Sequence, residues 1–104
     1  MKTDSVLRMI GLAAKAGKVV SGEFMTENAV KSKEAYLVII AQDVSNNTRK
    51  KFGNMCSYYK VEMREYADKD ALGHAIGKEF RASLAVTDEN LARAVEKKLK
   101  ERTV

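Results

Sequence analysis

The stretch Tyr36-Leu-Val-Ile-Ile-Ala41 decides the fold class of this chain, because its run of aliphatic residues is not interrupted by any polar side chain. A strand with one face in water alternates apolar and polar residues, whereas a continuous aliphatic run is typical of a strand covered on both faces. Residues 36–41 are therefore expected to form the central strand of a sheet that has helices on both sides.

Two helices and a short strand are expected before this central strand. Apolar residues at helical spacing mark the first helix, namely Val6, Ile10, Ala13 and Ala14. This helix should end near Gly17, since glycine readily adopts the left-handed conformation that terminates helices. Residues 18–20 then resemble a short strand, and Ser21 is expected to cap a second helix that runs to about Lys33.

Three further helices and two strands are expected after the central strand. The apolar stripe of a third helix consists of Phe52, Met55, Cys56 and Tyr59. Residues 61–65 form the next expected strand, and Asp68 or Asp70 should begin a fourth helix that ends at Gly77 and turns Leu72, Ala75 and Ile76 inward. Residues 82–86 are expected to form the last strand, and Thr87-Asp88-Glu89 should begin a final helix. Alternating helices and strands with short connections predict an α/β fold, arranged as a three-layer α/β/α sandwich.

Composition favours one domain spanning residues 1–104, because no proline, linker or repeat divides the chain. Cys56 is the single cysteine and cannot form an internal disulfide, and the absence of a Cys/His cluster argues against a metal site. No apolar run approaches the about 20 residues that a membrane helix needs, and the first residues lack a secretion signal. We therefore expect a cytoplasmic monomer without cofactor, metal or membrane.

Charge points to a polyanionic partner. Lysine and arginine number 19 against 14 acidic residues, which gives a net charge of +5 and favours nucleic acid. Catalysis is not expected, since no nucleophile pair or phosphate-loop signature is present and the apolar stripe buries Cys56. His74 should be solvated, because it lies roughly opposite the inward Leu72 on its helix. No small-molecule substrate is expected either.

The first candidate site is the junction Lys18-Val-Val-Ser-Gly-Glu-Phe24. Gly22 would let a backbone approach a phosphate or a base edge, and the N-terminus of the following helix attracts anions. If Met25, Ala29 and Val30 form the buried face, Phe24 and Asn28 point outward, where an aromatic ring can stack on a base. In the alternative interpretation Phe24 covers a neighbouring helix and Asn28 is merely solvated. Glu23 opposes anion binding, because its carboxylate occupies the position that a phosphate would take.

The second candidate site is the turn Gly77-Lys-Glu-Phe-Arg81, which places two cations and an aromatic ring within five residues. This composition suits phosphate neutralisation and base stacking. The alternative is an ordinary loop in which Lys78 and Arg81 are solvated. A third segment, Asn46-Asn-Thr-Arg-Lys-Lys51, is interpreted as a plain helix opening with an exposed basic face rather than as a phosphate site.

The chain resembles the kink-turn RNA-binding ribosomal protein family, of the L-seven-Ae type, and within it most closely the bacterial YlxQ-like branch. The resemblance covers about residues 6–97. Its carriers are Gly11-Leu-Ala-Ala-Lys-Ala-Gly-Lys-Val-Val-Ser-Gly-Glu23, Leu37-Val-Ile-Ile-Ala-Gln-Asp-Val44 with Asn47-Thr48, Leu72-Gly-His-Ala-Ile-Gly-Lys-Glu-Phe-Arg81 and Ala85-Val-Thr-Asp88. Together they are specific, although each alone is weak.

The resemblance implies a mixed four-stranded sheet, no enzymatic activity and binding to sharply bent internal-loop RNA. In the family the helix after the glycine contacts tandem sheared G·A pairs, and the loop before the last strand packs on a flipped-out nucleotide. On this chain those regions correspond to residues 22–28 and 77–81. The chain departs from the family pattern Gly-x-Asn-Glu-x-x-Lys, because Phe24, Met25 and Asn28 replace its three polar residues. Weaker or differently targeted RNA binding is therefore expected.

The sequence thus predicts a non-catalytic protein that binds structured RNA, such as ribosomal RNA, as a ribosomal or ribosome-associated monomer. The expected RNA-binding residues are Lys18, Gly22, Glu23, Phe24, Asn28, Lys31, Lys78, Glu79 and Arg81. The alternative hypothesis is a protein-interaction module that kept the fold but lost guanine-specific RNA recognition, with Phe24 as its apolar anchor.

Overall fold

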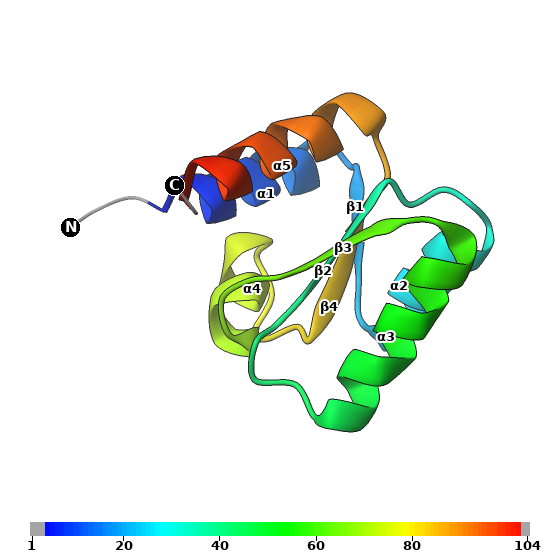
Figure 1. Ribbon diagram of the computed structural model, residues 1–104. Helices are drawn as coiled ribbons and strands as arrows, with labels where there is room; N and C mark the ends of the chain where they lie inside the picture. The colour runs from blue at the N-terminus through cyan, green and yellow to red at the C-terminus, as the bar shows by residue number, and fades with distance from the viewer. Residues whose placement is uncertain (1–3, 103–104) are drawn as a thin grey trace.

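A computed structural model describes residues 4–102, and in this part of the chain five helices surround a four-stranded sheet (Figure 1). In chain order the elements are α1 (Ser5–Lys15), β1 (Val19–Ser21), α2 (Glu23–Lys31), β2 (Leu37–Ile40), α3 (Asn46–Tyr59), β3 (Glu62–Glu65), α4 (Lys69–Ala75), β4 (Ser83–Val86) and α5 (Glu89–Arg102). Residues 1–3 and 103–104 lie outside the described residues. The prediction that the first residues lack a secretion signal therefore falls partly on residues that the structure does not describe.

The sheet is mixed, with the strand order β1-β4-β2-β3. β2 pairs in parallel with β3, whereas β4 runs antiparallel to both β1 and β2. All four residues of β2 are buried, so the central position predicted for residues 36–41 is confirmed. The inner strands β2 and β4 are completely enclosed, as their aliphatic sequences require.

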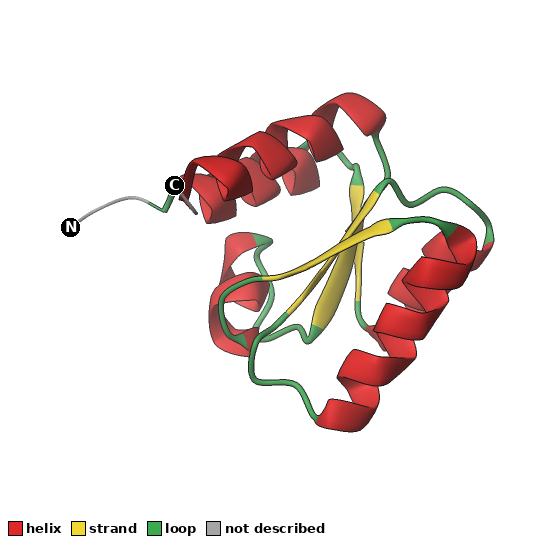
Figure 2. Cartoon of the chain, in the orientation of Figure 1, coloured by secondary structure: helices red, strands yellow, loops and turns green. Residues whose placement is uncertain are grey.

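Successive residues of β2 face opposite sides of the sheet and belong to two separate hydrophobic clusters. Leu37 and Ile39 pack in a cluster with residues of α1, α4 and α5, and Val38 and Ile40 pack in another with residues of α2 and α3. The sheet therefore lies between two helical layers, as Figure 2 shows. The predicted three-layer α/β/α sandwich is confirmed.

Several expected helix ends are found in the structure, and Asp4 adds a cap that the sequence analysis did not predict. Asp4 caps α1 by accepting hydrogen bonds from the N–H groups of Val6 and Leu7, and Gly17 adopts a positive φ of 75° after the helix. Asp68, one of the two residues expected to begin α4, accepts a hydrogen bond from the N–H of Ala71. Such caps satisfy N–H groups that have no partner within the helix.

The expectation for Ser21 is wrong. Ser21 is the last residue of β1, and Gly22 occupies the N-cap position of α2 without any side-chain hydrogen bond. The strand continues because Ser21 lies opposite Leu84 of β4, and the N–H of Gly22 donates to the carbonyl of Ser83. Pairing with β4 thus carries the strand one residue further than residues 18–20.

The expected buried face of α2 is also wrong in one position. The side chain of Met25 is 48% exposed, whereas Thr26 is fully buried beside Ala29 and Val30. Thr26 can be buried because its hydroxyl lies 3.3 Å from the hydroxyl of Ser83, which donates a hydrogen bond to it. The helix ends at Lys31, two residues before the expected end.

Candidate nucleic-acid interface

Three helices begin at one edge of the sheet. Ser21 at the end of β1 lies opposite Leu84 near the start of β4, and Ile40 at the end of β2 lies opposite both Ser83 and Glu65. The ends of β1, β2 and β3 therefore meet at the same edge, and each of these strands leads into the helix that follows it, α2, α3 and α4 respectively. Since a helix N-terminus carries partial positive charge, this edge is suited to anions.

The helix tip, residues 22–25, is open to an approaching ligand. Gly22 has φ 92° and ψ 158°, and apart from Gly22 and its two chain neighbours no residue in the range 4–102 has an atom within 4 Å of the position that a Cβ would occupy. Glycine has no side chain that could accept hydrogen bonds from the first turn of α2. The backbone at this point is therefore accessible, as the sequence predicted for Gly22.

The basic loop, residues 77–81, is packed tightly against α4. The N–H of Lys78 donates to the carbonyl of Gly73 at 2.8 Å, and a Cβ on Gly73 would meet the backbone of Phe80 at 2.4 Å. Lys78, Glu79 and Phe80 are exposed, and the ring of Phe80 is 58% accessible. The loop thus presents a cation and an aromatic ring on a fixed backbone.

Arg81 joins the basic loop to the helix tip. Its Nε donates to the Ser21 hydroxyl at 3.0 Å, its Nη1 donates to the Phe80 carbonyl at 2.7 Å, and its backbone N–H donates to the Lys69 carbonyl. The two candidate sites therefore lie side by side although 60 residues separate Ser21 from Arg81. The alternative in which Arg81 is merely a solvated charge does not hold, because the residue is half-buried and both its guanidinium and its backbone form hydrogen bonds.

Phe24 and Asn28 both face outward, as predicted. The Phe24 side chain is 71% exposed, which is incompatible with the alternative in which it covers a neighbouring helix. Asn28 is exposed one turn further along α2. An uncovered aromatic ring costs hydrophobic free energy unless a partner covers it, so Phe24 is a candidate surface for a stacked base.

An acid–base cluster lies along the exposed face of α2. Lys51 Nζ of α3 lies 2.7 Å from Glu23 Oε2 and 3.0 Å from Glu27 Oε1, and Lys31 Nζ lies 2.7 Å from Glu27 Oε2. Hydrogen bonds from Lys31 and Lys51 lower the pKa of Glu27. Lys51 therefore compensates the charge of Glu23 near the helix tip, a contact that sequence reasoning missed because the partner lies 28 residues away.

Not every expected residue reaches the interface. Lys18 stands at the opposite end of β1 from Gly22, about 13 Å away along the strand, and its carbonyl accepts a hydrogen bond from the N–H of Thr87. Lys31 lies at the C-terminal end of α2, and its ammonium forms an ion pair with Glu27. Both residues contribute to the long-range field rather than to the junction of helix tip and basic loop.

The start of α3 fits the interpretation of residues 46–51 as a helix opening. Ser45 caps the helix, and its hydroxyl accepts a hydrogen bond from the N–H of Thr48. Arg49 is bonded to Glu65, Asn46 and the carbonyl of Gln42, so its guanidinium ties α3 to the end of β3. Lys50 remains on an exposed face.

Neither the thiol nor the imidazole forms a reactive centre. Cys56 is buried in the predicted stripe of α3, and burial raises the pKa of its thiol to about 11. His74 is exposed, as expected. Within residues 4–102 no group of three acidic, histidine or cysteine side chains is placed to hold a metal ion, and no helix has the length and apolarity to cross a membrane.

The fold and the interface agree with a family assignment. Residues 4–98 match the model of the ribosomal protein L7Ae/L30e/S12e/Gadd45 family, so the chain belongs to this family. The resemblance inferred from the sequence is confirmed. Because the family is non-enzymatic, membership also confirms the expectation that the chain is not an enzyme.

Two relatives are named RNA-binding protein YlxQ. The protein from Bacillus subtilis strain 168 is 43% identical over 84 residues, covering 81% of this chain and 84% of its own length. The protein from Enterococcus faecium is 36% identical over 90 residues, covering 86% of each. These identities support the expected YlxQ-like branch.

Two solved structures share the fold. A protein of unknown function from Bacillus halodurans C superimposes with a TM-score of 0.91 at 30% identity, covering 94% of this chain and 99% of its own. The 15.5kD RNA binding protein of Giardia lamblia superimposes with a TM-score of 0.78 at 20% identity, covering 93% and 83%. The second likeness concerns the fold alone.

Proposed function

We propose that the protein binds structured RNA of the kink-turn type at the edge of the sheet where the helix tip and the basic loop meet. The single observation that carries this proposal is the Arg81–Ser21 hydrogen bond, which holds the two candidate sites side by side. The names of the YlxQ relatives support RNA as the partner. A monomer associated with ribosomal RNA in the cytoplasm is the setting we infer.

Each part of the interface has a distinct role in this proposal. The N–H groups of the helix tip approach the backbone or base edges of the RNA near Gly22, where nothing crowds the chain. Phe24 and Phe80 offer two exposed rings for unpaired bases, and Lys78 neutralises phosphate. Asn28 can form amide hydrogen bonds to a base, while Glu23 and Glu79 restrict which phosphates approach.

Affinity measured at several salt concentrations tests the proposal. If about three to five phosphates are neutralised, the logarithm of the affinity for a kink-turn RNA should fall against the logarithm of salt with a slope of about −3 to −4.5. Lys78→Ala should make the slope shallower by about 1. Phe24→Ala should weaken binding with little change in slope, because a stacking contact releases no counterions.

Lys97→Ala is the matched control, because it removes one exposed charge from α5. Lys97 lines a hollow together with Tyr36 and Glu62, which precede β2 and begin β3 at the opposite edge of the sheet. Equal effects of Lys78→Ala and Lys97→Ala would refute the interface. Absence of binding at low salt, with a protein partner retained after nuclease treatment, would favour the protein-interaction module instead.

A further inference from the structure

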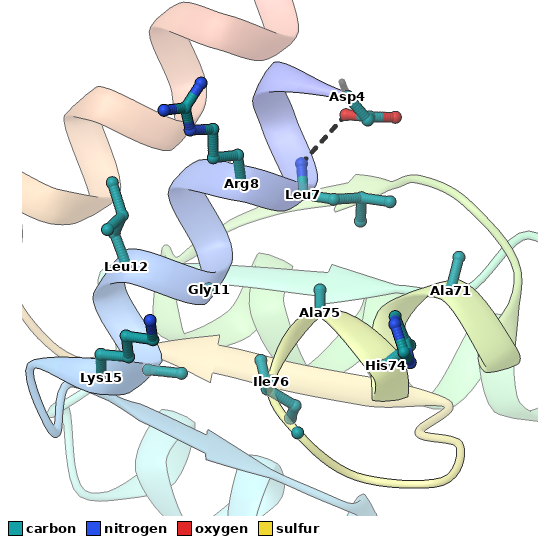
Figure 3. A pocket seen from close by; sticks show the side chains of 12 residues that line it. Asp4, Leu7, Arg8, Gly11, Leu12, Lys15, Ala71, His74, Ala75 and Ile76 are labelled. Carbon is teal, nitrogen blue, oxygen red and sulfur yellow. Dashed lines mark hydrogen bonds between the residues drawn. The ribbon is translucent and has the colours of Figure 1, made fainter. Parts of the chain in front are cut away.

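A groove of about 820 Å³ lies between α1 and α4, outside the junction of helix tip and basic loop (Figure 3). In Figure 3, Leu7 of α1 and Ala71 and Ala75 of α4 face the space between the two helices. Leu12 and Ile76 extend the apolar lining. The Leu12 side chain is 50% exposed, so part of this aliphatic surface is open to solvent.

The groove is shallow where the two helices touch. A Cβ added to Gly11 would lie 2.9 Å from the carbonyl oxygen of Ala75, so glycine is what permits this close approach. The close contact between Gly11 and Ala75 forms the floor of the groove, and the neighbouring side chains of α1 and α4 form its sides. Because α1 has 11 residues and an α-helix rises 1.5 Å per residue, the wall is about 16 Å long, or three helical turns.

The charged residues that line the groove are mostly basic. Arg8 and Lys15 of α1 are these basic residues, and neither forms an ion pair with any residue in the range 4–102. Asp4 is the one acidic residue of the lining, and its carboxylate already accepts hydrogen bonds from Val6, Leu7 and Tyr66. The open part of the groove is therefore apolar in its floor and cationic at its rim.

We propose that this groove binds an acidic amphipathic helix of a partner protein. An amphipathic helix places apolar side chains along one stripe and charged side chains on the flanks of that stripe. Leucine-type residues would cover Leu7, Ala71 and Ala75, and flanking carboxylates would face Arg8 and Lys15, which lie about 80 to 100° around α1 from Leu7. Charge complementarity of this kind selects the partner and its orientation.

The lining favours a peptide over RNA as the occupant. Unpaired bases stack on aromatic rings, and among the described residues the only ring that lines the groove is the imidazole of His74. Aliphatic side chains and small residues form the rest of the floor, which matches the apolar face of a helix. Gly77 borders both the groove and the basic loop, so the bound partner would lie next to RNA without occupying its site.

Fluorescence anisotropy with a labelled synthetic peptide tests the inference in the absence of RNA. The probe is a helix of about four turns with leucines on one stripe and glutamates on its flanks. Saturable binding is expected, with at least about a tenfold loss of affinity in the double variant Arg8→Glu/Lys15→Glu and in Leu12→Asp. The same leucine stripe flanked by lysines should bind the double variant better than the original chain.

The double variant Lys50→Glu/Lys97→Glu on α3 and α5 reverses the same number of exposed charges away from the groove, and it should leave peptide affinity within about twofold. Circular dichroism verifies that each variant is folded. No saturable binding up to about 1 mM would overturn the inference, as would binding that the groove variants leave unchanged. If Leu12→Asp weakens kink-turn RNA binding as well, the groove belongs to the RNA interface and the inference fails. If the unsubstituted protein binds the peptide but no kink-turn RNA, the proposed function fails and the inference about the groove still holds.

Discussion

At the scale of single residues, Gly73 determines where the basic loop can lie. A Cβ at this position would stand 2.4 Å from the Cα and 2.7 Å from the nitrogen of Phe80, which are backbone atoms that cannot rotate away. The hydrogen bond from the Lys78 N–H to the Gly73 carbonyl and the exposed position of Phe80 thus depend on having glycine at this point of α4. The interface is formed by close packing as much as by charge.

Gly73→Ala should destabilise the protein by about 1 to 3 kcal/mol, because the loop must move to make room for the methyl group. It should also weaken kink-turn RNA binding, since Phe80 and Lys78 move with the loop. Denaturant unfolding and RNA titration measure the two effects. Gly53→Ala is the control, because the nearest atom to its new Cβ is Met63 Cε at 3.9 Å. Alanine in α3 should raise the free energy of unfolding by at most about 1 kcal/mol.

Cys56 illustrates how burial sets reactivity. Because its thiol is buried and its pKa is raised to about 11, about one molecule in a thousand carries a thiolate at pH 8. A thiol reagent should therefore label the folded protein slowly, at a rate that rises steeply once denaturant unfolds it. Rapid labelling of the folded chain at neutral pH would contradict this prediction and reopen a role for Cys56 in catalysis.

At the scale of elements, Asp4, Tyr66 and Arg102 connect three segments that are distant in sequence. The hydroxyl of Tyr66, which follows β3, donates to Asp4 Oδ2 at 2.6 Å, and the guanidinium carbon of Arg102 in α5 lies 5.8 Å from the centre of the Tyr66 ring. Burial and the hydrogen bond to Asp4 raise the pKa of Tyr66 to about 12. The cap of α1 is thus tied to both the sheet and the last helix.

Asp4→Asn tests this connection through its pH dependence. Burial raises the pKa of Asp4, but hydrogen bonds from Tyr66 and the Leu7 N–H outweigh it, so the folded pKa is lowered. Stabilisation by the carboxylate is therefore present above the unfolded value of about 3.9 and is lost as pH falls through the folded pKa. The wild-type chain should be more stable than Asp4→Asn at pH 7.

Denaturant midpoints measured from pH 7 to pH 2 check the prediction. The difference in stability should shrink below about pH 4 and vanish at the acid end, because the protonated Asp4 and asparagine are both neutral acceptors for the helix cap. Tyr66→Phe removes the donor and should reduce the advantage at pH 7 by about 1 kcal/mol. A pH-independent difference would show that the charge of Asp4 does not stabilise the fold.

At the scale of the whole molecule, the sheet is shared by both hydrophobic clusters. Neighbouring residues Ile39 and Ile40 are each fully buried, yet they belong to opposite clusters. Neither layer of helices can separate without exposing one face of β2. We therefore infer that the chain folds as one domain with a single cooperative transition.

Ile39→Val and Ile40→Val form a matched pair for this inference. Each removes one buried methyl(ene) group and should cost about 0.5 to 1.5 kcal/mol, lowering the midpoint of the same transition. Far-ultraviolet circular dichroism and tyrosine fluorescence should report coincident curves for both variants. Two separate transitions, each sensitive to one substitution, would show that the layers unfold independently.

The order and type of the elements could be predicted from the sequence because they depend on local patterns. The aliphatic run in β2 indicated burial on both faces, the stripe through Phe52 and Cys56 indicated a helix, and Asp68 and Gly17 marked helix ends. Periodicity and caps act over a few residues, so a single sequence carries them directly. Outward Phe24 followed from the same reasoning.

Tertiary structure decided what lies beside what. The strand order β1-β4-β2-β3 is not sequential, and it makes Ser21 a strand residue bonded to Arg81 instead of a helix cap. The same packing buries Thr26 against Ser83 in place of Met25 and brings Lys51 to Glu23. Such contacts depend on the free energy of the complete packed arrangement, because loop closure brings together residues that no local pattern relates. Composition and periodicity determined the layers of this protein, and long-range packing alone decided that its helix tip and basic loop share one edge.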